Sequence, residues 1–281
     1  MNCSFTVTQR QRLSELNAEE PTLEKAFMDV SERNTFYKEE ETRLIRKNKE
    51  NLEDLLRNRH LPLLSSVEKR IADWLTEEMD FTRVNTPIII PETMLGKMSI
   101  TADHPLRQQI FWVDNKKCLR PMLAPNLYEM MKSIHRITRK PVRIFEIGPC
   151  FRKESQGAQH LNEFTMLNLV EFAESYKDGQ MTRLRELAAG AMSAVGIENY
   201  DLEITGSEVY GETLDVVVDE IELGSGAYGP HPLDSNWGIF DTNWVGIGFG
   251  MERIAMVSGS YSGIKRVGRS LAFLDGSRLN I

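Results

Sequence analysis

Apolar residues follow two patterns along the chain, one typical of helices and one typical of strands. Apolar residues recur at three- and four-residue intervals over residues 64–79, which predicts a helix. The same criterion predicts helices over residues 126–136, 181–195 and 252–257. Because strands far outnumber the helices between them, the pattern favours an α+β fold with a mainly antiparallel sheet flanked by helices. Alternating and β-branched runs predict these strands over residues 81–91, 109–113, 142–153, 164–172, 200–204, 209–218, 220–227 and 244–250.

The first sixty residues are more polar and charged than the rest of the chain. Residues 22–56 are rich in helix formers and contain neither proline nor glycine, which predicts a helical N-terminal extension over residues 1–60. Pro62 follows, and residues 61–281 are expected to form a second, larger domain. Pro87 interrupts a β-branched run, and since proline cannot donate to a sheet ladder, we expect this run at a sheet edge or an interface.

Composition excludes several classes of protein. The 281 residues are 41% hydrophobic and 27% charged, and no apolar run approaches the ~20 residues of a membrane span, so we expect a soluble protein. The N-terminal residues lack the features of a secretory signal, which makes a cytoplasmic location the expectation. Three widely separated cysteines and the lack of an H-E-x-x-H sequence disfavour a disulfide framework and a transition-metal site. Magnesium is the expected metal.

The charge of the chain is acidic overall but unevenly distributed. A net charge of −7 disfavours a general nucleic-acid coat. Basic residues nevertheless gather over residues 43–59 and near the C-terminus, at Lys265, Arg266, Arg269 and Arg278. Each cluster fits a solvated surface about as well as a phosphate-binding face.

The usual nucleotide-binding and hydrolase sequences are missing. The chain has no G-x-x-x-x-G-K-[ST] loop, and Gly246, Gly248 and Gly250 do not fit G-x-G-x-x-G. It has no G-x-S-x-G sequence either, which disfavours a serine hydrolase. Side chains must therefore bind any phosphate.

The stretch EIGPCFRKESQGAQHLNEFTMLNLV, residues 146–170, has an unusual polar pattern for a hairpin. Side chains alternate along a strand, so Arg152 and Glu154 share one face. Leu167 and Leu169 on the opposite face indicate a buried sheet, whose polar groups need partners such as a ligand. An exposed ion pair is the alternative interpretation. The return strand adds an aromatic ring and an amide on one face, with Phe164, Met166, Asn168 and Val170.

The stretch WVGIGFGMER, residues 244–253, places three glycines on one strand face beside Trp244. With no Cβ atoms on this strip, a planar ligand can lie flat against it, and Arg253 follows at its end. A glycine-rich strand packed under a helix is the alternative.

The stretch DVVVDEIELGSGAYGP, residues 215–230, offers oxygen ligands suited to magnesium in Glu222 and Ser225. These residues are three apart and would face opposite ways on a regular strand, so a bulge at Gly224 is needed to bring them together.

Taken together, two arginines, an acidic metal position, a ring and a glycine slot suggest an ATP site without a P-loop. The stretch RPMLAPNLYEMM, residues 120–131, could supply an adjoining apolar pocket, although such a stripe alone is more often core.

These motifs resemble those of a known family. FRKES with a loop ending at Phe164, followed by GFGMER, is similar to signatures of the class II aminoacyl-tRNA synthetases. CLRPMLAPNLY, IFEIGPCFRKES, HLNEFTMLN, VYGETLDV and WVGIGFGMER resemble, more narrowly, the pyrrolysyl-tRNA synthetase family. The resemblance extends from about Leu64 to the end. It implies the class II catalytic fold and an ATP-dependent ligase that charges a tRNA with pyrrolysine through an aminoacyl-adenylate.

The resemblance also implies residue roles in the nucleotide half of a site. Arg152 would bind the α-phosphate and stabilise charge as the amino-acid carboxylate attacks it, and Arg253 would clamp the triphosphate from the other side. Glu222 and Ser225 would bind Mg²⁺, with Glu222 counted among the catalytic residues. Further ATP contacts are implied for Glu154, His160, Leu161, Phe164 and Gly250.

In the amino-acid half, the resemblance implies that Asn168 hydrogen-bonds the side-chain carbonyl of pyrrolysine. Tyr210, expected on the strand before Gly211, would reach over the ring as a mobile lid. The rest of the pocket would comprise Ala124, Leu127, Tyr128, Met131, Val170, Trp244 and Gly248.

The chain departs from the family pattern at several points. Met251 replaces the usual leucine with little change of shape, whereas Met131 and Val170 occupy variable pocket positions and leave the preferred amino acid open.

The chain resembles short forms whose basic tRNA-binding domain is a separate protein or missing. The implied partners are the tRNA for pyrrolysine and a second copy of the chain, meeting at residues 65–91. A class II synthetase for another bulky amino acid and a non-catalytic paralogue that binds tRNA are the alternatives.

Overall fold

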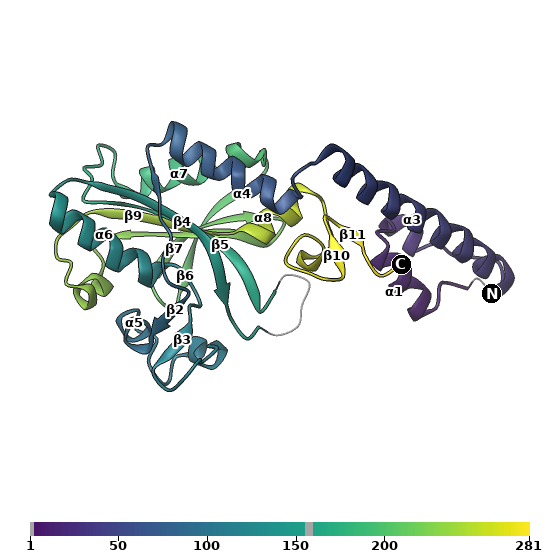
Figure 1. Cartoon of the computed structure of the whole chain (residues 1–281), viewed down its shortest axis with the longest axis horizontal. Coiled ribbons are helices and arrows are strands. Elements are labelled where there is room, and N and C mark those ends of the chain that lie inside the picture. The colour runs from purple at the N-terminus through teal and green to yellow at the C-terminus, as the bar shows by residue number, and fades with distance from the viewer. Residues whose placement is uncertain (1–2, 155–159) are drawn as a thin grey trace. The chain divides into compact units, whose positions relative to one another are not determined.

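The computed structural model describes residues 3–154 and 160–281 (Figure 1). The chain separates into two compact units. The first comprises Met1–Leu64 together with Lys265–Ile281, and the second comprises Ser65–Ile264. The C-terminal segment therefore groups with the N-terminal helices, which the sequence pattern did not indicate.

The first unit is built around the long helix α3 (Val30–Asn58), preceded by α1 (Val7–Glu15) and α2 (Glu20–Leu23). The Asp29 side chain caps α3 by accepting hydrogen bonds from two backbone N–H groups of its first turn. The short strands β10 (Phe273–Leu274) and β11 (Ser277–Arg278) pack in the same unit, where the buried Asn48 of α3 accepts from the Arg278 N–H at 2.7 Å. None of the described helices is long and apolar enough to cross a membrane.

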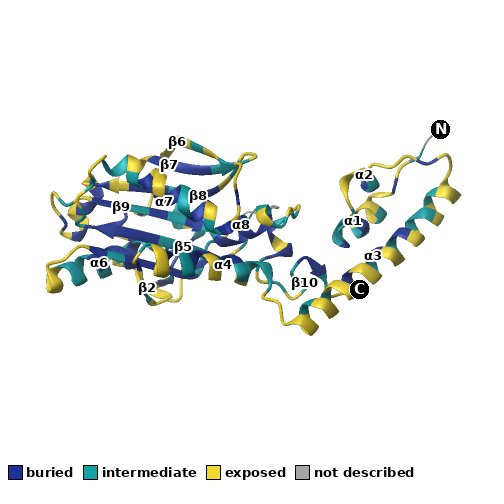
Figure 2. Cartoon of the chain, turned by 90° about the horizontal axis from the view of Figure 1, so that it is seen from above, coloured by how far each residue is buried: buried dark blue, intermediate teal, exposed yellow. Residues whose placement is uncertain are grey.

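The second unit is organised around a seven-stranded sheet, which confirms the mainly antiparallel prediction. Its strand order is β1-β4-β5-β9-β8-β7-β6, and only the β1–β4 pair is parallel. The strands are β1 (Thr82–Arg83), β4 (Val142–Phe151), β5 (Glu163–Phe172), β6 (Asp201–Ser207), β7 (Gly211–Val218), β8 (Ile221–Gly229) and β9 (Trp244–Gly250). Figure 2 shows buried residues running along these strands.

Helices cover the two faces of this sheet. Helix α7 (Gln180–Val195) packs on the back face, where its Leu184 lies so close to Gly226 that a Cβ there would approach the leucine to 2.8 Å. Trp74, which begins the π-helical turn Trp74–Glu78 after α4 (Leu63–Asp73), packs on Gly190 of α7 in the same way. On the front face lies α6 (Ala124–Thr138), and α8 (Met251–Ser258) follows β9.

The structure corrects the prediction for residues 81–119. Residues 109–113 do not form a strand: Pro105–Gln109 is a 3₁₀ helix, and Trp112 makes a single bridge to Cys118. The strand in this region is β3 (Lys117–Leu119), which pairs with β2 (Ile89–Pro91). Pro87 lies between β1 and β2, and the short α5 (Glu92–Lys97) follows.

The predicted irregularity in β8 is present. Val216 of β7 pairs with Gly224, while the next residue, Val217, pairs with Glu222. Leu223 is therefore the extra residue of a β-bulge, directly before Gly224. The bulge shifts the alternation of side chains by one residue.

Candidate active site

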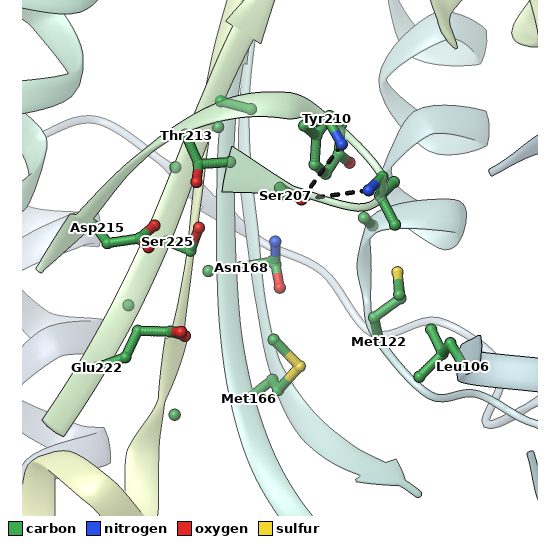
Figure 3. A pocket seen from close by; sticks show the side chains of 18 of the residues that line it. Leu106, Met122, Met166, Asn168, Ser207, Tyr210, Thr213, Asp215, Glu222 and Ser225 are labelled. Atoms are coloured by element: carbon green, nitrogen blue, oxygen red, sulfur yellow. Dashed lines mark hydrogen bonds between the residues drawn. The ribbon is translucent and has the colours of Figure 1, made fainter. Parts of the chain in front are cut away.

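A cavity of about 620 Å³ lies on the front face of the sheet (Figure 3). Helix α6, the turn between β6 and β7, and strands β5, β7, β8 and β9 contribute side chains to it. Every predicted site residue lines this one cavity: Ala124, Leu127, Tyr128, Met131, Arg152, Glu154, His160, Leu161, Phe164, Asn168, Val170, Tyr210, Glu222, Ser225, Trp244, Gly248, Gly250 and Arg253. The geometry brings these residues together, while their individual roles stay predictions.

Register across the sheet arranges the floor of the cavity in rows. Asp215 pairs with Ser225, Ser225 with Gly248, and Gly248 with Asn168. We call these four residues the central row. The neighbouring row toward α6 contains Val170, Gly246 and Ala227, and the row on the other side contains Met166 and Gly250.

Two arginines flank the half of the cavity that is predicted to bind the nucleotide. The Nε atom of Arg152 donates to the Pro121 carbonyl oxygen at 2.9 Å, and its guanidinium lies 5.3 Å from the centre of the Phe164 ring. Burial lowers the pKa of the Arg152 guanidinium. Arg253 donates to the backbone oxygen of Glu222 at 2.8 Å, with the Glu222 carboxylate 3.6 Å away. These contacts hold both guanidinium groups at the cavity wall.

The bulge in β8 turns Glu222 and Ser225 toward the same cavity. Their carboxylate and hydroxyl oxygens are the ligand type that Mg²⁺ prefers, and half of the Glu222 side chain is exposed. In the described part of the chain no group of three His, Cys, Asp or Glu residues is placed so that it could bind a metal ion. This donor set fits magnesium, which commonly takes one or two protein ligands and completes its shell with water and phosphate.

Asn168 occupies the centre of the floor. A Cβ atom on Gly248 would approach the Asn168 side-chain oxygen to 3.0 Å, so the bare glycine provides the space in which the amide lies. The Asn168 Oδ1 atom is buried and has no hydrogen-bond partner within the described residues. Figure 3 shows the amide nitrogen turned toward the loop that carries Tyr210. An unsatisfied buried amide at this position is a strong sign of a polar ligand.

Aromatic rings and one buried carboxylate form the half of the cavity that is predicted to bind the amino acid. The Tyr128 hydroxyl donates to Asp234 at 3.1 Å, and the Trp244 indole N–H donates to the other carboxylate oxygen at 2.9 Å. Burial raises the pKa of the Tyr128 phenol. Asp234 was missed by sequence reasoning. Its signal is the sequence HPLD, in which Asp234 accepts from the His231 N–H at the start of the 3₁₀ helix Pro232–Trp237.

Tyr210 lies in the turn between β6 and β7, which corrects its expected place on a strand: β7 begins only at Gly211. Its N–H donates to the Ser207 hydroxyl at 3.3 Å, drawn in Figure 3. The His231 ring accepts at Nδ1 from the Leu233 N–H, so Nε2 carries the hydrogen that bonds the Tyr210 carbonyl oxygen at 3.0 Å. The Tyr210 ring centre lies 6.3 Å from that of Trp244.

A buried polar network holds the elements next to the cavity in place, and sequence reasoning missed it as well. Arg120 and Glu146 form an ion pair at 2.7 Å, with side chains 1% and 3% exposed. Arg120 also donates to the Thr86 hydroxyl and the Pro149 carbonyl oxygen. Asn126 at the start of α6 donates to the same Thr86 hydroxyl. The network thus ties α6 and β4 to the segment around Pro87.

Some residues of the basic clusters are buried or ion-paired, and others are exposed. Arg266 and Arg278 are largely buried inside the first unit, where Arg278 pairs with Glu15 at 2.8 Å and Arg266 contacts Asn17. Arg43 pairs with Glu40 on α3. The exposed basic residues of this unit include Lys47, Lys49, Arg57, Arg59 and Lys265.

Comparison with known proteins gives the family. A model of the family described as tRNA synthetases class II core domain (F) matches residues 47–276. A crystal structure of pyrrolysyl-tRNA synthetase from Desulfitobacterium hafniense is 47% identical, with all of both chains covered and a TM-score of 0.93. A second structure of such an enzyme from the same organism is 47% identical with a TM-score of 0.89, covering 99% of this chain and 96% of that one.

More distant relatives belong to the same class. The phenylalanine–tRNA ligase alpha subunit of Mycoplasma pneumoniae is 24% identical over 195 residues, and that of Listeria welshimeri is 24% identical over 190 residues. The matches cover 60% of this chain, which spans about half the length of these curated relatives. The chain belongs to the class II aminoacyl-tRNA synthetases and, within them, to the pyrrolysyl-tRNA synthetase family.

Proposed function

We propose that the protein ligates pyrrolysine to its cognate tRNA in an ATP-dependent reaction, through an aminoacyl-adenylate and with release of AMP and pyrophosphate. The observation that carries this proposal is the arrangement around the central row. Arg152, Arg253 and Glu222 line one side of it, next to Ser225 in the row itself, and an apolar, aromatic pocket lines the other side. Asn168 lies between the two with an unsatisfied amide oxygen.

The nucleotide half suits displacement at a phosphate. Arg152 is held by Pro121 and packs beside Phe164, so an adenine ring stacked on Phe164 would bring its phosphates within reach of the guanidinium. Fixed positive charge near the α-phosphate stabilises the negative charge that develops as the carboxylate attacks. Arg253 would hold the opposite end of the triphosphate, with Glu154, His160, Leu161 and Gly250 as further ATP contacts.

Magnesium would be held by Glu222 and Ser225 and would neutralise phosphate charge when bound. Glu222 would also position Arg253. Its backbone oxygen accepts from Arg253, so the residue that offers a carboxylate to the metal also orients the arginine.

The amino-acid half fits a long side chain with one polar group. Ala124, Leu127, Met131 and Val170 supply apolar walls, and Tyr128 and Trp244 are fixed by Asp234. Asn168 would donate to a carbonyl group within the side chain, and Tyr210 would close over its far end. A mostly apolar pocket with one oriented amide can select a bulky acylated lysine.

Exchange of pyrophosphate into ATP, measured with a panel of amino acids that includes pyrrolysine and phenylalanine, tests this function. We expect pyrrolysine-dependent exchange. Exchange with phenylalanine alone would assign the chain to another specificity of the class, and no exchange with any amino acid would favour a non-catalytic paralogue.

The partners are part of the proposal. The cognate tRNA would contact the first unit, where exposed basic residues remain on α3 and at Lys265. A homodimer would form through residues 65–91, and a separately encoded tRNA-binding domain is a further proposed partner. Sedimentation as a monomer at micromolar concentration would contradict the dimer.

A further inference from the structure

The HPLD segment holds three aromatic residues of the pocket that is proposed to bind the amino acid. Asp234 holds Tyr128 and Trp244 through its two carboxylate oxygens. The His231 ring donates from Nε2 to the carbonyl oxygen of Tyr210 at 3.0 Å, and the two ring centres lie 5.7 Å apart. The His231 N–H in turn donates to Asp234 Oδ2 at 2.8 Å. One short segment therefore fixes both the walls of the pocket and the backbone of Tyr210.

The turn that carries Tyr210 has few other backbone contacts. It lies between β6 and β7 at the edge of the sheet, and the Ser207 hydroxyl accepts from the Val209 and Tyr210 N–H groups, both at 3.3 Å. These bonds lie within the turn itself. Among the described residues, the bond from His231 is the only one that joins the backbone of residues 207–210 to a part of the chain outside this hairpin. We therefore expect the position of the turn over the cavity to depend on His231.

A second H-P-L sequence in the chain shows that this hydrogen bond is separate from helix capping. His104 and His231 each precede a 3₁₀ helix and accept at Nδ1 from the N–H two residues further on, both at 3.1 Å. The Nε2 atom of His104 is buried and has no hydrogen-bond partner in the described part of the chain. Capping therefore does not require a bond at Nε2, and the bond from His231 to Tyr210 is an additional role.

We propose that His231 is a positioning residue, whose Nε2 hydrogen bond holds the Tyr210 turn over the bound amino acid. His231 is not among the described residues that line the cavity, so it acts through Tyr210. A turn that is fixed before the ligand arrives loses less conformational freedom on binding, which favours tighter binding of a long side chain. This inference rests on the proposed function in taking Tyr210 as the residue that closes over the far end of the substrate.

Two substitutions separate the hydrogen bond to Tyr210 from the helix cap. In His231→Asn the amide oxygen can replace Nδ1 and accept from the Leu233 N–H, but the shorter side chain has no donor that reaches the Tyr210 carbonyl oxygen. In His231→Gln the amide nitrogen can replace Nε2 and donate to Tyr210, but the acceptor for Leu233 is lost. If the histidine only caps the helix, His231→Gln is the more harmful change, whereas a positioning role makes His231→Asn the more harmful one.

Hydrogen–deuterium exchange of the Val209 and Tyr210 amides, measured without ligand, reports how often the turn opens. We expect about 2- to 12-fold faster exchange in His231→Asn, as loss of one net hydrogen bond predicts, and exchange close to that of the parent protein in His231→Gln. In pyrophosphate exchange, the KM for an Nε-acylated lysine should rise by a similar factor in His231→Asn, with kcat and the KM for ATP unchanged. Thermal unfolding checks that both variants are folded.

Turn amides that exchange in His231→Asn as in the parent protein would overturn the inference. Equal losses in the two variants would assign the effect to the helix cap, and an equal rise in both KM values would also contradict a role at Tyr210.

The proposed function fails separately from this inference. If the parent protein does not activate an acylated lysine, deuterium exchange still shows whether His231 holds the turn, and the KM comparison is made with the amino acid that the panel identifies. A parent protein that activates no amino acid would overturn both.

Discussion

The Nε atom of Arg152 donates to the carbonyl oxygen of Pro121, the residue directly after the buried Arg120. The arginine proposed to meet the α-phosphate is therefore oriented by a backbone atom whose own position is fixed by the ion pair of Arg120 with Glu146. In this segment the Arg120 side chain is buried in the interior, whereas the Pro121 carbonyl oxygen bonds a residue that lines the cavity. The orientation of Arg152 thus depends on residues that line no part of the cavity.

Replacement of Arg152 by alanine should strongly reduce adenylate formation. Loss of one preorganised charge-stabilising group typically lowers the rate by about 10²- to 10³-fold, and pyrophosphate exchange measures this loss. The melting temperature should change little, because the hydrogen bond from the guanidinium to the Pro121 carbonyl oxygen is the single one that this side chain makes to the described residues. Near-normal exchange by a folded Arg152→Ala variant would remove this residue from the mechanism.

Gly148→Ala should destabilise the second unit. A Cβ atom at this position would lie 2.3 Å from Nη2 of Arg120, which cannot move away without breaking its buried contacts. Overpacking of this kind costs about 1–3 kcal/mol, measurable by urea denaturation. Gly96→Ala in α5 is the control, since nothing lies within 4 Å of its added Cβ. A Gly148→Ala protein as stable as the Gly96→Ala protein would show that the network is not rigid.

Asp234→Asn should loosen the amino-acid pocket. Asp234 accepts from Tyr128 at Oδ1 and from Trp244 and a backbone N–H at Oδ2, so an asparagine keeps all three contacts only if its amide nitrogen faces Tyr128 and turns that hydroxyl from donor to acceptor. We expect a loss of about 1–3 kcal/mol in unfolding free energy and a higher KM for the amino acid, with the KM for ATP unchanged. Asp241→Asn replaces an exposed carboxylate and should change none of these values. An equal rise in both KM values would contradict a role confined to the pocket.

The buried thiols predict a specific pH dependence. Burial raises the pKa of Cys118 to about 11 and that of Cys150 to about 12, from an ordinary value of 9.0. The folded state thus retains thiol protons that the unfolded state releases, so the free energy of unfolding should fall as pH rises from 9 toward 12. A Cys118→Ala, Cys150→Ala double variant should lose this component. Thiol labelling at pH 8 should modify only the partly exposed Cys3 before unfolding.

Charge reversal on α3 should weaken tRNA binding. Lys47 and Lys49 are exposed, so Lys47→Glu with Lys49→Glu would remove phosphate-binding charges without disturbing the core. The slope of log affinity against log salt should become shallower by about 0.9 for each phosphate that the variant no longer neutralises, while pyrophosphate exchange stays unchanged. Lys177→Glu on the second unit serves as the charge control. If it weakens binding as much, the tRNA surface lies elsewhere.

Strand parity accounts for much of what the sequence predicts correctly about the cavity. Alternation along β5 and β9 places Asn168 and Gly248 on one face, and the register pairs them directly. The spacing of Glu222 and Ser225 requires an irregular strand, which the bulge at Leu223 provides. Local rules suffice here because the face of a strand residue depends only on its own strand.

The residues that escaped prediction depend on contacts distant in sequence. Asp234 meets Tyr128 across more than a hundred residues, and no local pattern encodes that meeting. Residues 109–113 look like a strand because they are mostly β-branched and aromatic, but Pro105 starts a 3₁₀ turn and only Cys118 offers a bridge. Tyr210 falls in a turn because Gly211, with φ of 72°, begins the strand after it.

The central row has a consequence for how this enzyme family can diversify. Gly250, a proposed ATP contact, stands one row to one side of it, and Val170, a proposed wall of the amino-acid pocket, stands one row to the other side. Four positions along a single strand therefore separate the row of the proposed ATP contact from the row of the proposed amino-acid contact. If these roles hold, substitutions at Val170 and Ala227 should change the choice of amino acid and leave the ATP contacts in place.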